Sequence, residues 1–139
     1  MKSLTCDVLV IGSGPAGLAA GVAAKEAGAA EVMVIERNDE LGGILQQCIH
    51  NGFGLRVFGS DLTGPEYAWR WIRRAQAAEL TVLSETMVLS LSKERRAVAS
   101  NSRLGLVEIA ARAVVLAMGC RERPRGALAI PGSRPAGVY

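Results

Sequence analysis

The sequence predicts one α/β domain that combines a parallel sheet, helices packed on it and an antiparallel β-meander. Three observations support this fold class. A strand–helix–strand pattern opens the chain, three short strand-like segments follow later, and the residues are 50% hydrophobic but only 4% aromatic. Small aliphatic residues are typical of helices packed on a parallel sheet. A length of 139 residues is that of a single domain.

The first part of the chain carries the strand–helix–strand pattern. We expect a buried strand over Asp7–Ile11, a helix over Pro15–Gly28 and a second strand over Glu31–Glu36. A unit of this kind, about 30 residues long, is right-handed, and its two strands are therefore parallel.

Glycines interrupt the pattern between residues 37 and 61, where we expect loop with a short helical turn near Ile44–Cys48. Thr63 and Glu66 have the spacing of a capping box, which predicts a helix that ends near Ala78. The later strand-like segments are Thr81–Leu83, the meander strands Thr86–Leu91, Ala97–Ser100 and Gly105–Ala110, and a buried strand over Ala113–Ala117.

Composition and charge argue against several classes of protein. No apolar run approaches the ~20 residues that a membrane span needs, and the first residues do not have the pattern of a secretion signal. The net charge is +3, but the basic residues form no nucleic-acid-binding motif. The three cysteines lack metal-ligand spacing, so we expect no metal, reduced thiols and a cytoplasmic location.

Three glycines between the first strand and the helix form a dinucleotide-binding fingerprint. Gly12 permits a tight turn, Gly14 lets the backbone approach a pyrophosphate, and Gly17 allows close packing of helix and strand. The helix N-terminus offers free N–H groups to the phosphates. Glu36 ends the next strand, where a carboxylate accepts hydrogen bonds from ribose hydroxyls. The same charge would repel a 2′-phosphate, which disfavours NADP.

These segments resemble the flavoproteins with two dinucleotide-binding domains, which include the pyridine nucleotide-disulfide oxidoreductase family. The resembling segments are 8–20, 34–37, Gly42–Gly43 and Val114–Pro124. The resemblance implies an incomplete Rossmann-like FAD/NAD(P)-binding three-layer fold, with FAD as cofactor and hydride or electron transfer as chemistry. The cofactor-binding residues that it implies are Gly12, Ser13, Gly14, Pro15, Ala16, Gly17, Glu36, Arg37, Gly42, Gly43, Met87, Val88, Ala117, Met118 and Gly119.

Two details refine the resemblance. Met118 replaces the usual threonine of the family's Ala-Thr-Gly motif, and backbone around Thr86–Val88 is expected to meet the adenine. The stretch Gly42–Gly54, with Leu62–Tyr67, further resembles bacterial flavoproteins associated with glycerol 3-phosphate oxidation and their amino-acid or opine oxidase relatives.

Cys48 and His50 are the candidate catalytic residues. In the family's disulfide reductases, the segment after Gly-Gly carries a pair of redox cysteines, but here Leu45 stands where the second would be. Without a partner thiol this segment cannot cycle between dithiol and disulfide, so we expect no disulfide reductase activity. His50 has a side chain suited to proton transfer beside a flavin. A packed structural cysteine and a loop histidine bonded to backbone remain the alternatives.

We interpret residues 1–120 as the N-terminal segment of an FAD-binding domain and residues 121–139 as a connector towards a second nucleotide-binding domain, through which NAD(H) would bind. The resemblance implies that later segments complete the FAD site. We therefore expect this chain alone to bind FAD through its ADP half, with little turnover. A complementary subunit or self-association at an unpaired sheet edge is the expected partnership. Two other functions stay open: an NAD-binding dehydrogenase domain and a non-catalytic interaction module.

Overall fold

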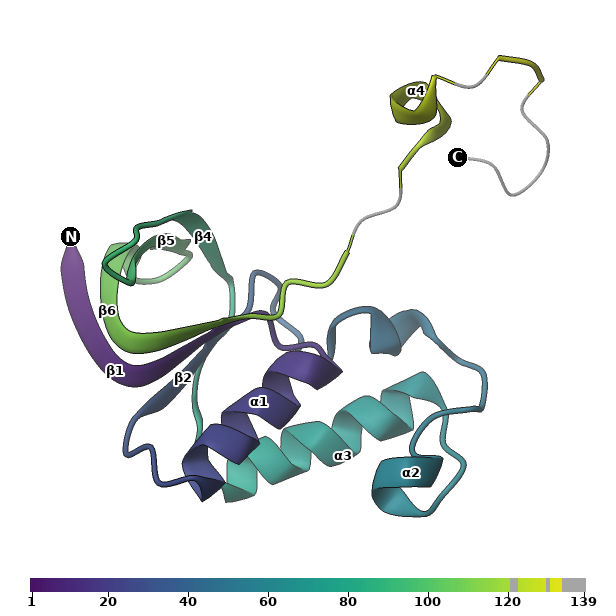
Figure 1. Ribbon diagram of the computed structural model, residues 1–139, viewed down its shortest axis with the longest axis horizontal. Coiled ribbons are helices and arrows are strands. Elements are labelled where there is room, and N and C mark those ends of the chain that lie inside the picture. Colours follow the sequence, from purple (N-terminus) through teal and green to yellow (C-terminus); the bar gives the residue numbers. More distant parts are fainter. Residues whose placement is uncertain (121–122, 130, 134–139) are drawn as a thin grey trace.

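A mixed sheet with the strand order β3-β2-β1-β6-β5-β4 organises the chain (Figure 1). The computed structural model describes residues 1–120, 123–129 and 131–133. The strands are β1 (Lys2–Ile11), β2 (Val32–Ile35), β3 (Thr81–Leu83), β4 (Thr86–Leu91), β5 (Arg96–Asn101) and β6 (Gly105–Leu116). The helices are α1 (Pro15–Glu26), the 3-10 helix η1 (Gly43–Gln47), α2 (Leu55–Phe58), α3 (Gly64–Ala77) and α4 (Arg125–Leu128).

The sheet has a parallel part and an antiparallel part that share β6. β1 pairs in parallel with both β2 and β6, and β2 pairs in parallel with β3. β4, β5 and β6 form the predicted antiparallel meander. The carboxyl ends of the parallel strands therefore lie at one common edge, where ligands bind in open α/β sheets.

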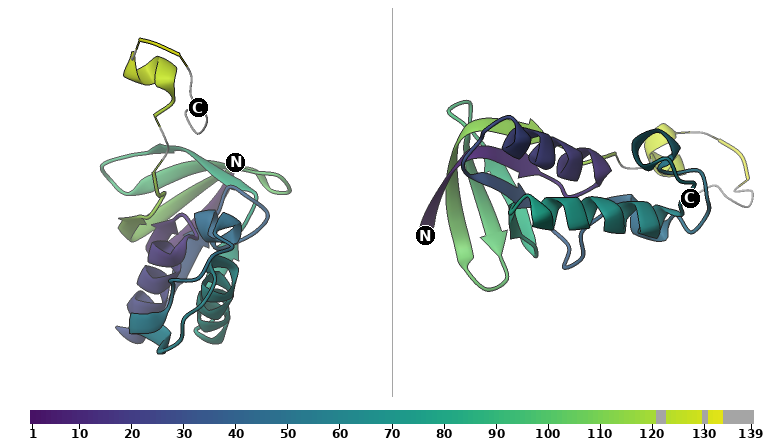
Figure 2. Two further views of the ribbon diagram at one scale, coloured as in Figure 1. Left: turned by 90° about the vertical axis from the view of Figure 1, so that its right-hand side faces the viewer. Right: turned by 90° about the horizontal axis from the view of Figure 1, so that it is seen from below.

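Helices α1 and α3 lie side by side on one face of the parallel sheet (Figure 2). Leu18 and Val22 of α1 form a buried cluster with Trp71 and Ala75 of α3. α3 starts where the sequence predicts, because Thr63 and Glu66 form a capping box. The Thr63 N–H donates to Glu66 Oε2 at 2.8 Å, and the Thr63 side chain accepts the Glu66 N–H in return.

The meander covers the opposite face of the sheet. Leu9 and Ile11 of β1 share a buried cluster with Ala97 of β5 and with Val107 and Ile109 of β6. Ala97 and Ala99 of this cluster are small, which lets the meander approach the sheet closely. The predicted α/β fold with three layers is thus confirmed.

One strand prediction was wrong. Gly105–Ala110 and Ala113–Ala117 were expected to be two separate strands, but β6 runs without a break from Gly105 to Leu116. The reason is that β1 starts at Lys2 rather than at the expected Asp7, and its ladder runs along nearly the whole of β6. β5 pairs only with Gly105–Ala110 of β6, whereas β1 pairs with residues from Val107 to Leu116, so the burial pattern of β6 changes midway while its direction persists.

The region between residues 37 and 61 contains η1, which was expected as a helical turn, and α2, which was not expected. α2 has only four residues and lies between Gly54 and Gly59, both at positive φ. Such a short helix leaves no periodic signal in the sequence. No helix among the described residues has both the length and the apolar character that a membrane crossing requires. Residues 121–122, 130 and 134–139 of the predicted connector lie outside the described residues.

Candidate nucleotide-binding site

The loop between β1 and α1 requires glycine at two positions for steric reasons. Gly12 has a φ of +105°, and a side chain there would collide with the carbonyl oxygen of Ala117. A side chain at Gly17 would collide with the carbonyl oxygen of Gly12. The Gly12 N–H donates to the Ile35 carbonyl at 2.8 Å, which ties the loop to the end of β2. The backbone of this loop is therefore closely packed against Ala117 and the end of β2.

Gly14 differs from its neighbours because it faces open space. A Cβ placed on Gly14 would meet no atom within 4 Å. Gly14 is also the N-cap of α1, which has no side-chain cap and no acidic residue in its first turn. Pro15 is the first residue of α1, and Ala16 follows it on the exposed side. The uncapped N–H groups and the helix dipole make this point suitable for an anion.

The Glu36 carboxylate lies directly beside this loop. Only 7% of Glu36 is exposed. Its Oε2 accepts hydrogen bonds from the Ser13 N–H at 3.1 Å and from the Ser13 hydroxyl at 2.6 Å. Its Oε1 accepts the Asn38 N–H at 2.9 Å. Among the described residues no lysine or arginine forms an ion pair with Glu36. The adjacent Arg37 is exposed.

Two further segments that the sequence assigned to the site also meet the loop. The Gly42 N–H donates to the Ser13 carbonyl at 3.0 Å, and a Cβ on Gly43 would lie 3.2 Å from Gly14 Cα. Ala117 donates its N–H to the Ile11 carbonyl at 2.8 Å. Beyond this residue, Met118 is exposed and Gly119 has a positive φ of 71°.

Strand β4 starts next to the backbone of Glu36. The buried Thr86 donates its N–H to the Glu36 carbonyl at 2.8 Å. The side chain of Asn101 donates to Thr86 Oγ1 at 2.7 Å and so holds the start of the strand. Met87 is exposed and Val88 is half-buried. The strand expected to meet an adenine is therefore a direct neighbour of the residue expected to bind the ribose.

Cys48 and His50 are held by contacts of another kind. The Cys48 thiol donates to the Ile44 carbonyl at 3.4 Å, and the Cys48 carbonyl accepts the Gly64 N–H at 2.8 Å. The exposed His50 places Nδ1 2.8 Å from the Asn51 carbonyl, and its ring lies 5.3 Å from that of Phe53. These contacts suit the structural alternatives, and a catalytic role for either residue stays a prediction.

The sequence missed two contributors to the site, Asn38 and Thr86, although the segment around Thr86 was expected nearby. Both act through their backbone N–H groups, which any residue except proline could supply. No side-chain pattern could have identified them. The orientation of the Ser13 hydroxyl towards Glu36 was also missed, although a hydroxyl residue inside the fingerprint is a signal that could have suggested it.

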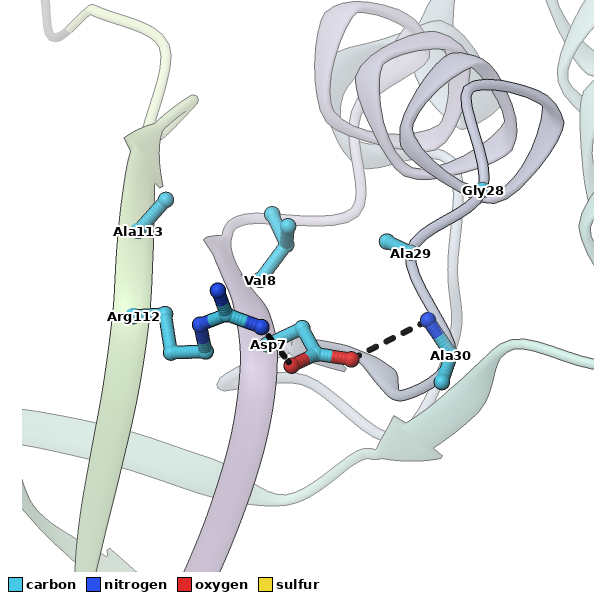
Figure 3. A pocket seen from close by; sticks show the side chains of 7 residues that line it. All are labelled: Asp7, Val8, Gly28, Ala29, Ala30, Arg112 and Ala113. Atoms are coloured by element: carbon cyan, nitrogen blue, oxygen red, sulfur yellow. Dashed lines mark hydrogen bonds and ion pairs between the residues drawn. The ribbon is translucent and has the colours of Figure 1, made fainter.

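A shallow cavity lies at the other edge of the parallel sheet, at the C-terminal end of α1 (Figure 3). It is lined by Val8, Gly28, Ala29, Ala113 and the Asp7–Arg112 pair. Asp7 accepts the N–H groups of Ala30 and Glu31, each at 3.0 Å, and Arg112 lies 3.2 Å from its Oδ1. These bonds, led by the backbone N–H of Glu31, hold the pKa of the Asp7 carboxyl below its usual range. They connect β1, β6 and the turn before β2.

Comparison with known proteins places these features in a family. Residues 6–138 match the model of the pyridine nucleotide-disulphide oxidoreductase family. An opine oxidase subunit of Agrobacterium tumefaciens (strain Ach5) is 34% identical over 95% of this chain, which spans 27% of that protein. The alpha subunit of sarcosine oxidase from Corynebacterium sp. (strain P-1) is 36% identical over 85% of this chain, which spans 13% of that protein.

Among solved structures, the L-proline dehydrogenase of P. horikoshii is similar to this chain with a TM-score of 0.71 and 26% sequence identity. The similarity covers 85% of this chain and 23% of that one. The chain therefore spans about a quarter or less of these relatives. The fold, the glycine loop with its carboxylate and the family match agree: this chain belongs to the pyridine nucleotide-disulphide oxidoreductase family.

Proposed function

We propose that this chain binds the ADP half of FAD and is the cofactor-binding part of a flavin-dependent oxidoreductase. The observation that carries the proposal is the pair formed by Gly14 and Glu36. Gly14 leaves open space at an uncapped helix N-terminus, as a pyrophosphate needs. Glu36 holds a buried carboxylate beside it without an ion pair among the described residues, as a ribose needs.

The position of β4 supports an adenosine at the end of this site. Thr86 binds the Glu36 carbonyl, so the β4 backbone begins where the base attached to the ribose would lie. Met87 and Val88 follow, on a strand whose ladder among the described residues is with β5 alone. Backbone N–H and C=O groups on its other side can read an adenine edge. Pyrophosphate, ribose and base thus each have supporting groups in this part of the chain.

The nature of the nucleotide follows from charge and from the relatives. The Glu36 carboxylate would repel a 2′-phosphate, which disfavours NADP. The family resemblance and the oxidase relatives favour FAD over NAD. When FAD is bound it accepts two electrons from a substrate, and the protein supplies its position, its electrostatic surroundings and the exclusion of water.

For the whole protein we propose an oxidation at a carbon–nitrogen bond of an amino-acid-like secondary amine. The relatives are named for opines, sarcosine and L-proline. Sarcosine and proline are both secondary amines, in which a C–N bond becomes an imine when two electrons and two protons are removed. Two relatives are named as subunits, which supports partnership with a complementary subunit. The unpaired state of Cys6, Cys48 and Cys120 supports a cytoplasmic location.

The proposal is tested by titrating the purified chain with ADP, FAD and NAD in a calorimeter. We expect ADP and FAD to bind with similar affinity, because the groups assembled here all serve the ADP half. We expect NAD to bind more weakly than FAD. Failure of both ADP and FAD to bind would overturn the proposal. An FAD affinity far above that of ADP would show that the flavin ring also has its site in this chain.

The variant Gly14→Val tests the assignment of the loop. The added side chain enters open space, so the fold should persist, but it occupies the position proposed for the pyrophosphate. We expect ADP and FAD binding to be lost while the thermal unfolding curve stays close to that of the unmodified chain. Unchanged affinity for both nucleotides would contradict the assignment.

A further inference from the structure

The hydrogen bonds of Glu36 show how much of its carboxylate is available to a ligand. An ionised carboxylate offers about four acceptor positions, two on each oxygen. Oε2 already accepts two bonds, one from the Ser13 N–H and one from the Ser13 hydroxyl. Oε1 accepts one bond from the Asn38 N–H. With these three bonds from the residues that the structure describes, one acceptor position remains, and it is on Oε1.

Ser13 is firmly held in this arrangement. It is fully buried, and its hydroxyl lies 2.6 Å from the carboxylate, a short distance that is typical of a charge-assisted hydrogen bond. Its carbonyl accepts the Gly42 N–H, and its own N–H points to the same Oε2. Turning the hydroxyl away would leave a buried hydroxyl without a partner, at a cost comparable to that of a lost hydrogen bond.

We propose that Ser13 is a specificity-determining residue that leaves Glu36 able to accept a hydrogen bond from only one of the two ribose hydroxyls. This inference rests on the proposed function, because it concerns the ribose of the bound ADP half. The Ser13 hydroxyl occupies the acceptor position that a second ribose hydroxyl would use. The ribose is therefore recognised through one hydroxyl, which donates a hydrogen bond to Oε1 of Glu36. The other hydroxyl contributes nothing to binding at Glu36.

The experiment compares the affinities of ADP, 2′-deoxy-ADP and 3′-deoxy-ADP for the unmodified chain by calorimetric titration. We expect one deoxy analogue to bind about tenfold or more weakly than ADP, since it lacks a hydrogen bond to a charged group. The other analogue should bind within about twofold of ADP. Two analogues that are equally weakened, or that both bind as well as ADP, would overturn the inference.

Ser13→Ala provides the second measurement. Removing the hydroxyl frees the second position on Oε2, so both deoxy analogues should now bind more weakly than ADP. Ser13→Thr restores a hydroxyl and should restore the dependence on a single ribose hydroxyl. The matched control is Ser60→Ala, because the Ser60 hydroxyl bonds the Phe58 carbonyl and not Glu36. This control should keep the pattern of the unmodified chain.

The outcomes separate the inference from the proposed function. No binding of ADP or FAD by the unmodified chain overturns both. Binding of ADP with equal dependence on the two hydroxyls overturns only the role of Ser13. Circular dichroism establishes that each variant is folded, and if Ser13→Ala does not fold, the comparison of the two analogues in the unmodified chain decides the question.

Discussion

The parallel sheet has one edge at the carboxyl ends of its strands, which holds Glu36, and one at their amino ends, which holds Asp7. Each carboxylate accepts hydrogen bonds from backbone N–H groups, yet the two differ in what surrounds them. Glu36 accepts the N–H of Ser13, and Asp7 accepts that of Ala30, with a separation of 23 residues in both pairs. Asp7 also has Arg112 at 3.2 Å and is partly open to solvent. Glu36 is buried and, among the described residues, has no such cation.

The difference supports the proposal that the edge holding Glu36 is the one that binds a ligand. Arg112 balances the charge of Asp7, and the hydrogen bonds of Asp7 connect three segments, so this carboxylate stabilises the fold without a ligand. Burying a carboxylate that lacks a cation is unfavourable, and natural proteins compensate such groups with hydrogen bonds or with a ligand. Glu36 has hydrogen bonds from the protein, and it keeps an acceptor position that a ligand can use.

The largest expected effect is on the free energy of unfolding, and it distinguishes Gly17, at the edge that holds Glu36, from Gly28, at the edge that holds Asp7. In Gly17→Ala the new Cβ meets the Gly12 carbonyl, so backbone must move, and we expect a loss of roughly 3 kcal/mol in unfolding free energy. Gly28→Ala is the matched change at the other edge, where φ is +97° but a Cβ meets nothing within 4 Å. It should cost roughly 1 kcal/mol, from backbone strain alone. Urea unfolding measures both, and equal losses would show that the two edges are packed alike.

A second prediction concerns ligand affinity. Glu36→Gln removes the negative charge beside the loop and replaces one acceptor oxygen with an amide NH₂ group. We expect ADP affinity to fall about tenfold or more, since hydrogen bonds to a charged group are the stronger ones. Asp7→Asn is the control: it removes a charge from the opposite edge, near the C-terminal end of α1, whose 12 residues span about 18 Å, and it should leave ADP affinity unchanged. Equal affinity in both variants would remove the functional distinction between the two carboxylates.

Much of the fold and part of the site could be predicted from the sequence, because their signals are local. The run Asp7–Ile11, the capping box of Thr63 and Glu66, and the short strand Thr81–Leu83 each lie where the pattern placed them. Gly12 and Gly17 could be identified because the spacing of their fingerprint between a strand and a helix is itself a local pattern. The steric reason for Gly12 could not be read in this way, because the carbonyl that excludes a side chain there belongs to Ala117.

The features that could not be predicted depend on residues far apart in the sequence. The continuity of β6 follows from the ladder with β1, whose register no local pattern reveals. The contact of Thr86 with Glu36 spans 50 residues, uses a backbone N–H group and carries no side-chain signature. The Asp7–Arg112 pair joins residues 105 positions apart. Such contacts arise only when the elements pack, so the fold has to be known first.

The smallest expected effect is the change of the free energy of unfolding with pH that arises from the Asp7 carboxyl. Its pKa in the folded protein lies below the ordinary value of 3.8, so folding favours the ionised form. The stabilisation by Asp7 is therefore complete above about pH 4 and is lost as the pH falls through the folded-state pKa. Asp7→Asn lacks this contribution at every pH, so the gap in urea midpoint between the two chains should narrow on acidification from pH 7 to pH 3. The gap should be modest even at pH 7, because the Arg112 side chain is 86% exposed and solvent screens the pair.

The carboxyls of Glu66 and Glu94 also have lowered pKa values, but they titrate in both chains, so their contributions cancel in the difference between the two urea midpoints. A gap that stays constant with pH would mean that the Asp7 carboxylate contributes through its shape alone, and the contrast between the two edges would then rest on Glu36 and its burial.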